Sequence, residues 1–305
     1  MEVIGIDHGN AAMKTRNFCF PSGVAEYEHE PFAGSDVLEY YGKYYVCGTG
    51  RQPFLKDKTS DQRYFILTLA AIAKELRVRK IPSPANIIIG AGLPLTNYGR
   101  EKKRFTEYLL SHPNPIRFKY DGMGYEINIR GIKIYPQAFA ALFLHMNTII
   151  GEPSVIVADV GGWTVDLMRL DHGMPDAESC RSLELGIIRC MDEIAEQVRR
   201  RTGLSVTSSQ IESVLKDEPC SVHEKAKTII MNEGKSYAKR LISAISESGL
   251  DPYAMPILFM GGGAMLMKKH TLDTLGLFRP IIIPDVCMNA KGYEFLCGNS
   301  SGGVS

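Results

Sequence analysis

The sequence predicts an α/β protein of two related lobes, each built on a mixed sheet and carrying a small inserted subdomain. Three observations lead to this prediction. Residues 3–14 (VIGIDHGNAAMK) read as a buried strand, a tight Asp-x-Gly turn and a second strand, and residues 155–167 (VIVADVGGWTVDL) repeat that pattern half a chain later. Strand-like apolar runs alternate with helical patterns in both halves. A chain of 305 residues is also long enough for about two domains.

Each copy of the repeat places a glycine two residues after an aspartate. Because glycine has no Cβ, Gly9 and Gly161 allow backbone N–H groups to come close to an anion. Asp7 and Asp159 would repel a phosphate directly, so we expect them to hold the waters around a Mg²⁺ ion. One such turn alone could equally be an ordinary hairpin. The repetition favours a phosphate-holding turn in each lobe.

Composition excludes several classes of protein. The 35 basic and 34 acidic residues are interspersed, so we expect no direct contact with nucleic acid. The seven cysteines form no Cys-x-x-Cys pair and the seven histidines are scattered, which suits a reducing cytoplasm and gives no transition-metal site. No apolar run approaches the roughly 20 residues that span a membrane, and no signal peptide precedes the first strand. We therefore expect a cytoplasmic protein without a membrane anchor.

The first lobe is expected to cover residues 1–150. Residues 11–20 should continue as a strand after the first turn, and residues 21–58 should form the inserted subdomain. The remaining elements expected in this lobe are a helix after Asp61, a buried strand over 85–90, a charged helix over 98–110, strands over 116–120, 125–129 and 132–135, and a helix over 137–149.

The second lobe is expected to cover residues 151–287, with a boundary at Gly151-Glu152-Pro153. It opens with the repeated turn, and its later elements are expected to be a helix carrying Ile187 to Val198 on its apolar face, a helical insert over 208–250, a strand over 256–260 and a helix opening at Gly261-Gly262-Gly263. A final helix over 288–297 should return to the first lobe.

The glycine triplet at 261–263 adds a third candidate feature. Three glycines between a buried strand and a helix allow a flat ligand to lie against bare backbone, and the start of the helix favours phosphate. The triplet alone could be a flexible turn. Its position in the same lobe as the second turn favours a binding role.

Five motifs occur in a fixed order along the chain. They are Asp7-x-Gly9 with Lys14, Tyr135-Pro136-Gln137-Ala138, Asp159-x-Gly161-Gly162-x-Thr164-x-Asp166, Gly261-Gly262-Gly263-Ala264 and Asn289-Ala290-Lys291-Gly292. Together they resemble the actin-like ATPase superfamily, which also holds sugar kinases and heat-shock chaperones, and the resemblance covers nearly the whole chain. Within the superfamily the likeness is greatest to the ParM-type plasmid-segregation actins.

This resemblance implies a role for each motif residue. Asp7 and Asp159 would hold Mg²⁺ through water, and Gln137 would orient the attacking water, which a neutral amide can do although it is a poor base. Asp166 matches Lys14 in the repeat, and could also close a turn or a salt bridge. The nucleotide-binding residues implied by the resemblance are Gly9, Asn10, Ala11 and Lys14 at the terminal phosphates, Gly161, Gly162 and Thr164 at the γ-phosphate, and Gly261, Gly262 and Gly263 at the adenosine.

The function implied by the resemblance is a slow ATPase with ATP and Mg²⁺ as cofactors. It would polymerise into dynamic filaments that segregate plasmid DNA through a DNA-binding adaptor protein. Two alternatives remain open at the level of sequence. One is a small-molecule, sugar-type kinase of the same fold, in which Asp166 would serve as the base, and the other is a nucleotide-binding module without turnover.

Overall fold

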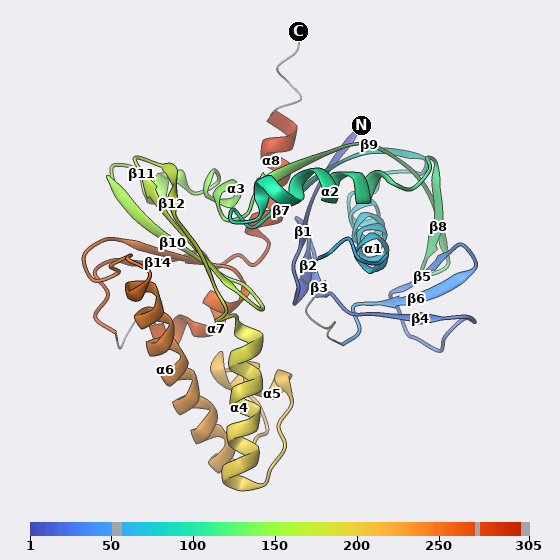
Figure 1. Cartoon of the computed structure of the whole chain (residues 1–305). Coiled ribbons are helices and arrows are strands. Elements are labelled where there is room, and N and C mark those ends of the chain that lie inside the picture. The colour runs from blue at the N-terminus through green and yellow to red at the C-terminus, as the bar shows by residue number, and fades with distance from the viewer. Residues whose placement is uncertain (51–56, 272–274, 300–305) are drawn as a thin grey trace. The chain divides into compact units, whose positions relative to one another are not determined.

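The computed structural model describes residues 1–50, 57–271 and 275–299, with the backbone alone for residues 267–271. It divides into two compact units. The first comprises Met1–His145 together with Cys287–Ser305, and the second comprises Met146–Val286. The chain therefore leaves the first unit, completes the second, and returns to the first with its last helix (Figure 1).

The first unit is built on a nine-stranded sheet with the order β3-β2-β1-β7-β9-β8-β5-β6-β4. Its strands are β1 Glu2–His8, β2 Ala12–Lys14, β3 Cys19–Pro21, β4 Val24–Tyr27, β5 Val37–Tyr40, β6 Lys43–Cys47, β7 Ala85–Leu93, β8 Ile116–Tyr120 and β9 Met123–Pro136. Its helices are α1 Arg63–Val78, α2 Tyr98–Leu110, α3 Phe139–Leu142 and α8 Met288–Asn299.

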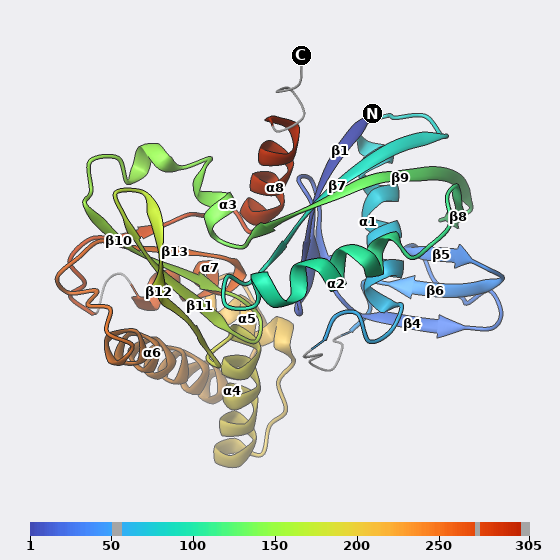
Figure 2. The same ribbon diagram turned by 45° about the horizontal axis from the view of Figure 1, so that its top comes forward.

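The sheet of the first unit curves around α1 (Figures 1 and 2). This helix is apolar on nearly every side, and residues 64–73 are all buried. A helix that is apolar all round must be enclosed, since no polar stripe remains to face water. Ile4 and Ile6 of β1 belong to the same fully buried core, whereas Gly5 between them faces α8 on the opposite side of the sheet.

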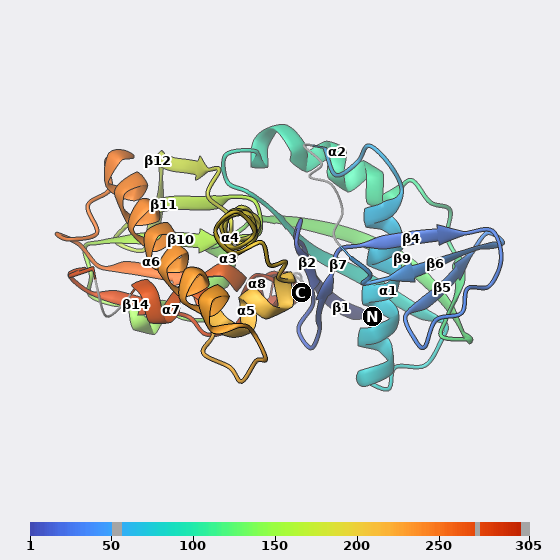
Figure 3. The same cartoon turned by 90° about the horizontal axis from the view of Figure 1, so that it is seen from below.

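The second unit is built on a five-stranded sheet with the order β12-β11-β10-β13-β14. Its strands are β10 Ser154–Val160, β11 Val165–Asp171, β12 Met174–Leu183, β13 Ile257–Met260 and β14 Pro280–Ile282. Its helices are the short 3-10 helix Met146–Thr148, α4 Ile187–Thr202, α5 Ser208–Leu215, α6 Glu224–Glu247 and α7 Gly262–Thr271. Figure 3 shows α4, α5 and α6 gathered on one face of this sheet.

The two sheets share one topology. In the first, β1 pairs antiparallel with β2 and parallel with β7, which pairs parallel with β9. In the second, β10 pairs antiparallel with β11 and parallel with β13, which pairs parallel with β14. The outer strands β3 and β12 are antiparallel to their neighbours in both. This duplication confirms the predicted fold class of two related mixed-sheet units.

Four expected elements were wrong in detail. The strand over 11–20 is a hairpin, because the Thr15 side chain accepts from the Phe18 amide and the chain turns back so that Lys14 pairs with Cys19. The strands over 125–129 and 132–135 are one strand, β9, with a bulge at Arg130.

The helix over 137–149 is also wrong. Only Phe139–Leu142 is α-helical, and Met146–Thr148 forms a separate 3-10 turn in the second unit. Ala138 has φ +60° and ψ −51°, which no α-helix contains, so the helix cannot begin before Phe139.

Candidate functional site

The first turn joins β1 to β2 and brings opposite charges together. Asp7 and Lys14 are cross-strand partners in the ladder, so their side chains lie on the same face of the sheet. The Lys14 ammonium lies 3.1 Å from Oδ2 of Asp7, whose residue is only 2% exposed. This pair presents a carboxylate and an ammonium together at the end of one strand.

The backbone of the first turn is fixed from one side. The Ser22 hydroxyl donates to the Asn10 carbonyl at 2.6 Å, and the Ser22 amide donates to the Ala11 carbonyl at 3.2 Å. In a trans peptide the C=O and the following N–H point in opposite directions. The amides of Ala11 and Ala12 therefore point away from Ser22, as an anion-binding turn requires.

The side chain of Asn10 is also held. The Tyr64 hydroxyl of α1 donates to Asn10 Oδ1 at 2.9 Å, and Lys58 donates to the His8 carbonyl. Ser22, Lys58 and Tyr64 were missed by the sequence analysis. No local pattern marks them, because each reaches the turn from a different part of the chain.

His8 is a structural residue beneath this turn. The Thr68 hydroxyl donates to the Tyr64 carbonyl at 2.6 Å and is hydrogen-bonded with His8 Nε2 at 2.9 Å. Burial, together with the nearby Lys58, lowers the pKa of His8 to about 3. The imidazole, which also meets the edge of Phe105, is therefore neutral at physiological pH.

Gln137 follows the end of β9 and reaches the same turn. Its side-chain Nε2 donates to Asp7 Oδ1 at 3.3 Å, and its backbone amide donates to the Leu93 carbonyl at 2.9 Å. Within the first unit the fold thus gathers Asp7 and Lys14, predicted from one motif, with Gln137, predicted from another.

The second turn joins β10 to β11 and repeats the geometry of the first. Asp159 and Asp166 are cross-strand partners, at the same positions that Asp7 and Lys14 occupy in the first unit. The Thr164 hydroxyl lies 3.5 Å from Asp166 Oδ2. The second turn thus presents two carboxylates, whereas the first presents a carboxylate and an ammonium. The two carboxylates suit a cation.

The start of α4 holds the backbone of the second turn. The amides of Ile187, Ile188 and Gly186 donate to the carbonyls of Gly161, Gly162 and Trp163, at 3.0, 2.8 and 2.9 Å respectively. By the planar geometry of the trans peptide, the three following amides, of Gly162, Trp163 and Thr164, all point away from α4. Three successive amides turned to one side form a concave donor surface for an anion.

Two glycines shape this region: Gly161, whose place at the γ-phosphate stays a prediction, and Gly186, which the sequence analysis missed. The Gly161 amide donates to the Thr164 carbonyl at 2.9 Å, so this residue closes the turn and the three residues after it offer their amides. A Cβ on Gly186 would come within 2.2 Å of the Trp163 backbone, so only glycine allows α4 to begin against the turn. Sequence reasoning missed Gly186, and the signal was its position just before the apolar helical pattern.

The glycine triplet lies beside the carboxylate of Asp159. Gly261 has φ +85°, and a Cβ there would lie 2.4 Å from Asp159 Oδ1. A Cβ on Gly263 would lie 2.4 Å from Cγ1 of Val160, so this glycine serves close packing. A Cβ on Gly262 would meet nothing within 4 Å, which leaves the bare backbone that a flat ligand needs. Contact with an adenosine stays a prediction for all three.

The donor set at both turns fits a hydrated Mg²⁺ ion better than a directly ligated metal. No group of three or more His, Cys, Asp and Glu suited to a metal occurs among the described residues. Asp7 and Asp159 each stand at the rim of an amide-lined turn, where a carboxylate can hold metal-bound water while the amides hold phosphate. Within the part of the chain that the structure describes, no helix is long and apolar enough to cross a bilayer.

Comparison with known families supports this interpretation of the two units. Residues 5–139 match the model for the N-terminal domain of actin-like proteins. Residues 157–273 match the model for the C-terminal part of the archaeal actin homologue described as MreB-like. An archaeal actin homologue of Thermoplasma acidophilum is 27% identical over 227 residues, which are 68% of this chain and 69% of the relative.

Solved structures give the same fold. The crystal structure of an archaeal actin homologue matches with a TM-score of 0.79 at 22% identity, covering 98% of this chain and all of the other. A complex of that homologue with ADP matches with a TM-score of 0.76 at 21% identity, with the same coverage. A 15-stranded ParM filament from Clostridium botulinum matches with a TM-score of 0.74 at 19% identity, covering 97% of this chain and 99% of the other.

Proposed function

Since the chain belongs to the actin-like ATPase superfamily, we propose that it binds and hydrolyses ATP and that its subunits polymerise into filaments. The observation that carries the nucleotide site is the second turn. The carbonyls of residues 161–163 accept hydrogen bonds from the start of α4, and the amides of residues 162–164 point to the opposite side. Asp159 lies near the end of the strand that leads into this turn. That combination suits a polyphosphate with a hydrated cation.

The roles of the residues follow from the same contacts. We assign Gly9, Asn10, Ala11 and Lys14 to phosphate binding at the first turn, and Gly162 and Thr164 at the second, with Gly161 shaping that turn. Bound Mg²⁺ would neutralise phosphate charge and orient the terminal phosphoryl group. We assign Asp7 in the first unit and Asp159 in the second each to holding metal-bound water. Gln137 would orient the attacking water, and the hydrogen bond that its side chain donates to Asp7 supports this assignment.

Filament formation is the second part of the proposal. The support is the fold that this chain shares with the subunit of a ParM filament. Head-to-tail assembly needs a heterologous interface that does not close into a ring, and a nucleotide that favours one conformation of the subunit can control it. Hydrolysis would be slow and linked to assembly.

For the biological process we propose plasmid segregation in the cytoplasm. The resemblance to ParM supports this choice. Because the net charge is +1, we expect contact with DNA to pass through a DNA-binding adaptor protein. Retention of an otherwise unstable plasmid that carries the gene and its flanking DNA tests this part. Equal loss with and without the gene would contradict it.

Sedimentation tests the main proposal. Protein at tens of micromolar is mixed with Mg-ATP, a slowly hydrolysed analogue or Mg-ADP, and phosphate release is followed in parallel. We expect pelleting with ATP and the analogue, and return to the supernatant as ADP accumulates. A chain that binds ATP but neither pellets nor hydrolyses is a nucleotide-binding module, and one that stays in the supernatant but phosphorylates a sugar is a kinase.

A further inference from the structure

The last helix, α8, lies directly against the backbone of the first sheet. Cβ atoms placed on Gly5, Gly90 and Gly92 would come within 1.9, 2.8 and 2.0 Å of α8 atoms. A Cβ on Gly292 of α8 would lie 2.4 Å from the Ala140 carbonyl. Glycine at these four positions lets α8 approach β1, β7 and α3 more closely than side chains would permit.

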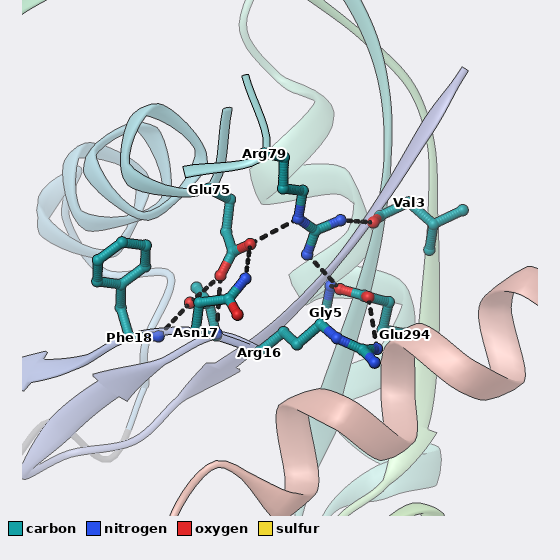
Figure 4. A network of polar contacts seen from close by, with 9 residues as sticks. Val3, Gly5, Arg16, Asn17, Phe18, Glu75, Arg79 and Glu294 are labelled. Atoms are coloured by element: carbon teal, nitrogen blue, oxygen red, sulfur yellow. Dashed lines mark hydrogen bonds and ion pairs between the residues drawn. The ribbon is translucent and has the colours of Figure 1, made fainter. Parts of the chain in front are cut away.

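A polar network fixes the register of α8 along the sheet (Figure 4). Glu294 of α8 accepts from the Gly5 amide at 3.3 Å and pairs with Arg79, the residue after α1, at 2.6 Å and with Arg16 at 3.0 Å. Arg79 also pairs at 2.6 Å with Glu75, which is fully buried. Because these partners come from β1, from the C-terminal cap of α1 and from the β2–β3 hairpin, α8 has little freedom to slide.

Glu75 connects the same network to the β2–β3 hairpin, which follows the first turn in the chain. Its carboxylate accepts from the Thr15 hydroxyl at 2.5 Å, and from the backbone and side-chain amides of Asn17 at 3.0 and 2.8 Å (Figure 4). Thr15 directly follows Lys14. One buried carboxylate therefore ties α8, through Arg79, to the strand that carries the Lys14 ammonium.

The other end of α8 holds a strained turn. The Phe139 amide donates to the Gln137 carbonyl at 2.6 Å around Ala138, which has φ +60° and ψ −51°. These values describe the γ-turn with a positive central φ, which is rare and strained. The Ala138 amide donates at 2.9 Å to Oδ1 of Asn289, a buried residue in the first turn of α8. Such strain persists only where the surroundings hold it.

We propose that Asn289 is a positioning residue for Gln137, which it serves by clamping the Ala138 γ-turn. The inference rests on the proposed hydrolytic function, because Gln137 needs to be held only if it orients a water. Three contacts fix the backbone on either side of its Cα: the Leu93 carbonyl, the Phe139 amide and, through Ala138, the Asn289 side chain. Without the clamp the turn relaxes, and the Gln137 amide leaves Asp7.

The test compares Asn289→Ala with Asn289→Asp. The aspartate retains an oxygen that accepts the Ala138 N–H, and alanine does not. We expect Asn289→Ala to release phosphate about tenfold more slowly in a single turnover, with the Kd of the nucleotide changed less than about twofold, since positioning acts in the transition state. Asn289→Asp should remain within about threefold of the wild type.

A double variant separates positioning from general damage to the fold. In a Gln137→Ala background, Asn289→Ala should slow phosphate release no further, because the residue it positions is already absent. The matched control is Arg16→Ala, which removes the ion pair between the half-exposed Arg16 and Glu294 of the same helix and should leave turnover unchanged. The proposal is overturned if Asn289→Ala releases phosphate at the wild-type rate. It is also overturned if Asn289→Asp is as slow as Asn289→Ala.

Amide hydrogen exchange provides a readout that does not depend on catalysis. The Ala138 amide should exchange at least about tenfold faster in Asn289→Ala than in the wild type. If the wild type hydrolyses no ATP, the proposed function fails, while faster exchange would still establish the clamp and unchanged exchange would refute it. Should Asn289→Ala not fold, Asn289→Ser replaces it, because serine stays polar at the buried helix start but is too short to reach the Ala138 amide.

Discussion

Replacing Gly261 by alanine tests whether the close approach of the glycine triplet to Asp159 matters for stability and turnover. Gly261 has φ +85°, and a Cβ there would lie 2.4 Å from Asp159 Oδ1 and 2.8 Å from the Val160 carbonyl oxygen. Gly249 in the same unit offers a matched control. Its φ is +89°, and a Cβ on it would meet nothing within 4 Å. The two alanine variants share the backbone strain and differ in the crowding.

The structure gives the magnitude for each variant. An alanine held at positive φ costs roughly 1–2 kcal/mol, which is the whole expected loss of unfolding free energy for Gly249→Ala. Gly261→Ala adds overpacking, typically about 1–3 kcal/mol, for a total of about 2–5 kcal/mol. An ordinary Cβ contact begins at 3.4 Å, so the Asp159 carboxylate must move by about 1 Å, and a misplacement of that size can reduce turnover about a hundredfold.

Urea unfolding measures the loss of unfolding free energy, and phosphate release measures the loss of turnover. Gly249→Ala should unfold at lower urea than the wild type but hydrolyse ATP at the wild-type rate, whereas Gly261→Ala should lose both stability and turnover. If both variants keep full turnover, the distance between Gly261 and the Asp159 carboxylate has no bearing on catalysis. If both lose it equally, backbone strain alone is responsible and the crowding argument is wrong.

Three further predictions concern the two turns. Asp159→Ala should reduce steady-state ATP hydrolysis about a hundredfold or more, in line with the loss of one electrostatic catalytic group, and an unchanged rate would mean that the second turn does not serve the nucleotide. Gln137→Ala should slow phosphate release in a single turnover while the Kd of the nucleotide stays nearly constant, and a collapse of affinity would make Gln137 structural. Burial lowers the pKa of His8 from 6.5 to about 3, so as the pH falls the imidazole is protonated in the unfolded chain before it is protonated in the folded one. The free energy of unfolding should therefore drop by about 2 kcal/mol between pH 6.5 and pH 5. Urea titrations of His8→Gln should lack this part of the drop.

The duplicated core could be predicted because its signals are local. Both repeats combine a buried strand with an Asp-x-Gly turn, and the register of Asp7 with Lys14 and of Asp159 with Asp166 follows from the spacing within each repeat. The glycine triplet was likewise predicted to lie between a strand and a helix, and α7 begins at Gly262. Periodicity and turn chemistry suffice where the interacting residues are neighbours in sequence.

The supports of the turns could not be predicted, since they depend on tertiary contacts. Ser22 lies near the first turn in sequence, yet only the pairing of β2 with β3 brings it beneath Asn10. Gly186 holds the second turn from the start of α4, more than twenty residues away. The helix over 137–149 failed for the same reason, because a bond from α8 overrides the helical preference of Ala138.

The position of α8 in the chain also bears on synthesis. A ribosome completes residues 1–145, and then the entire second unit, before it reaches the helix that covers Gly5 and Gly90. Until that helix emerges, the nascent first unit has an uncovered sheet face and lacks the Asn289 amide that holds Ala138. The first unit therefore completes its fold only after the whole second unit has been synthesised. Any assembly that needs a complete first unit must wait until α8 has been made.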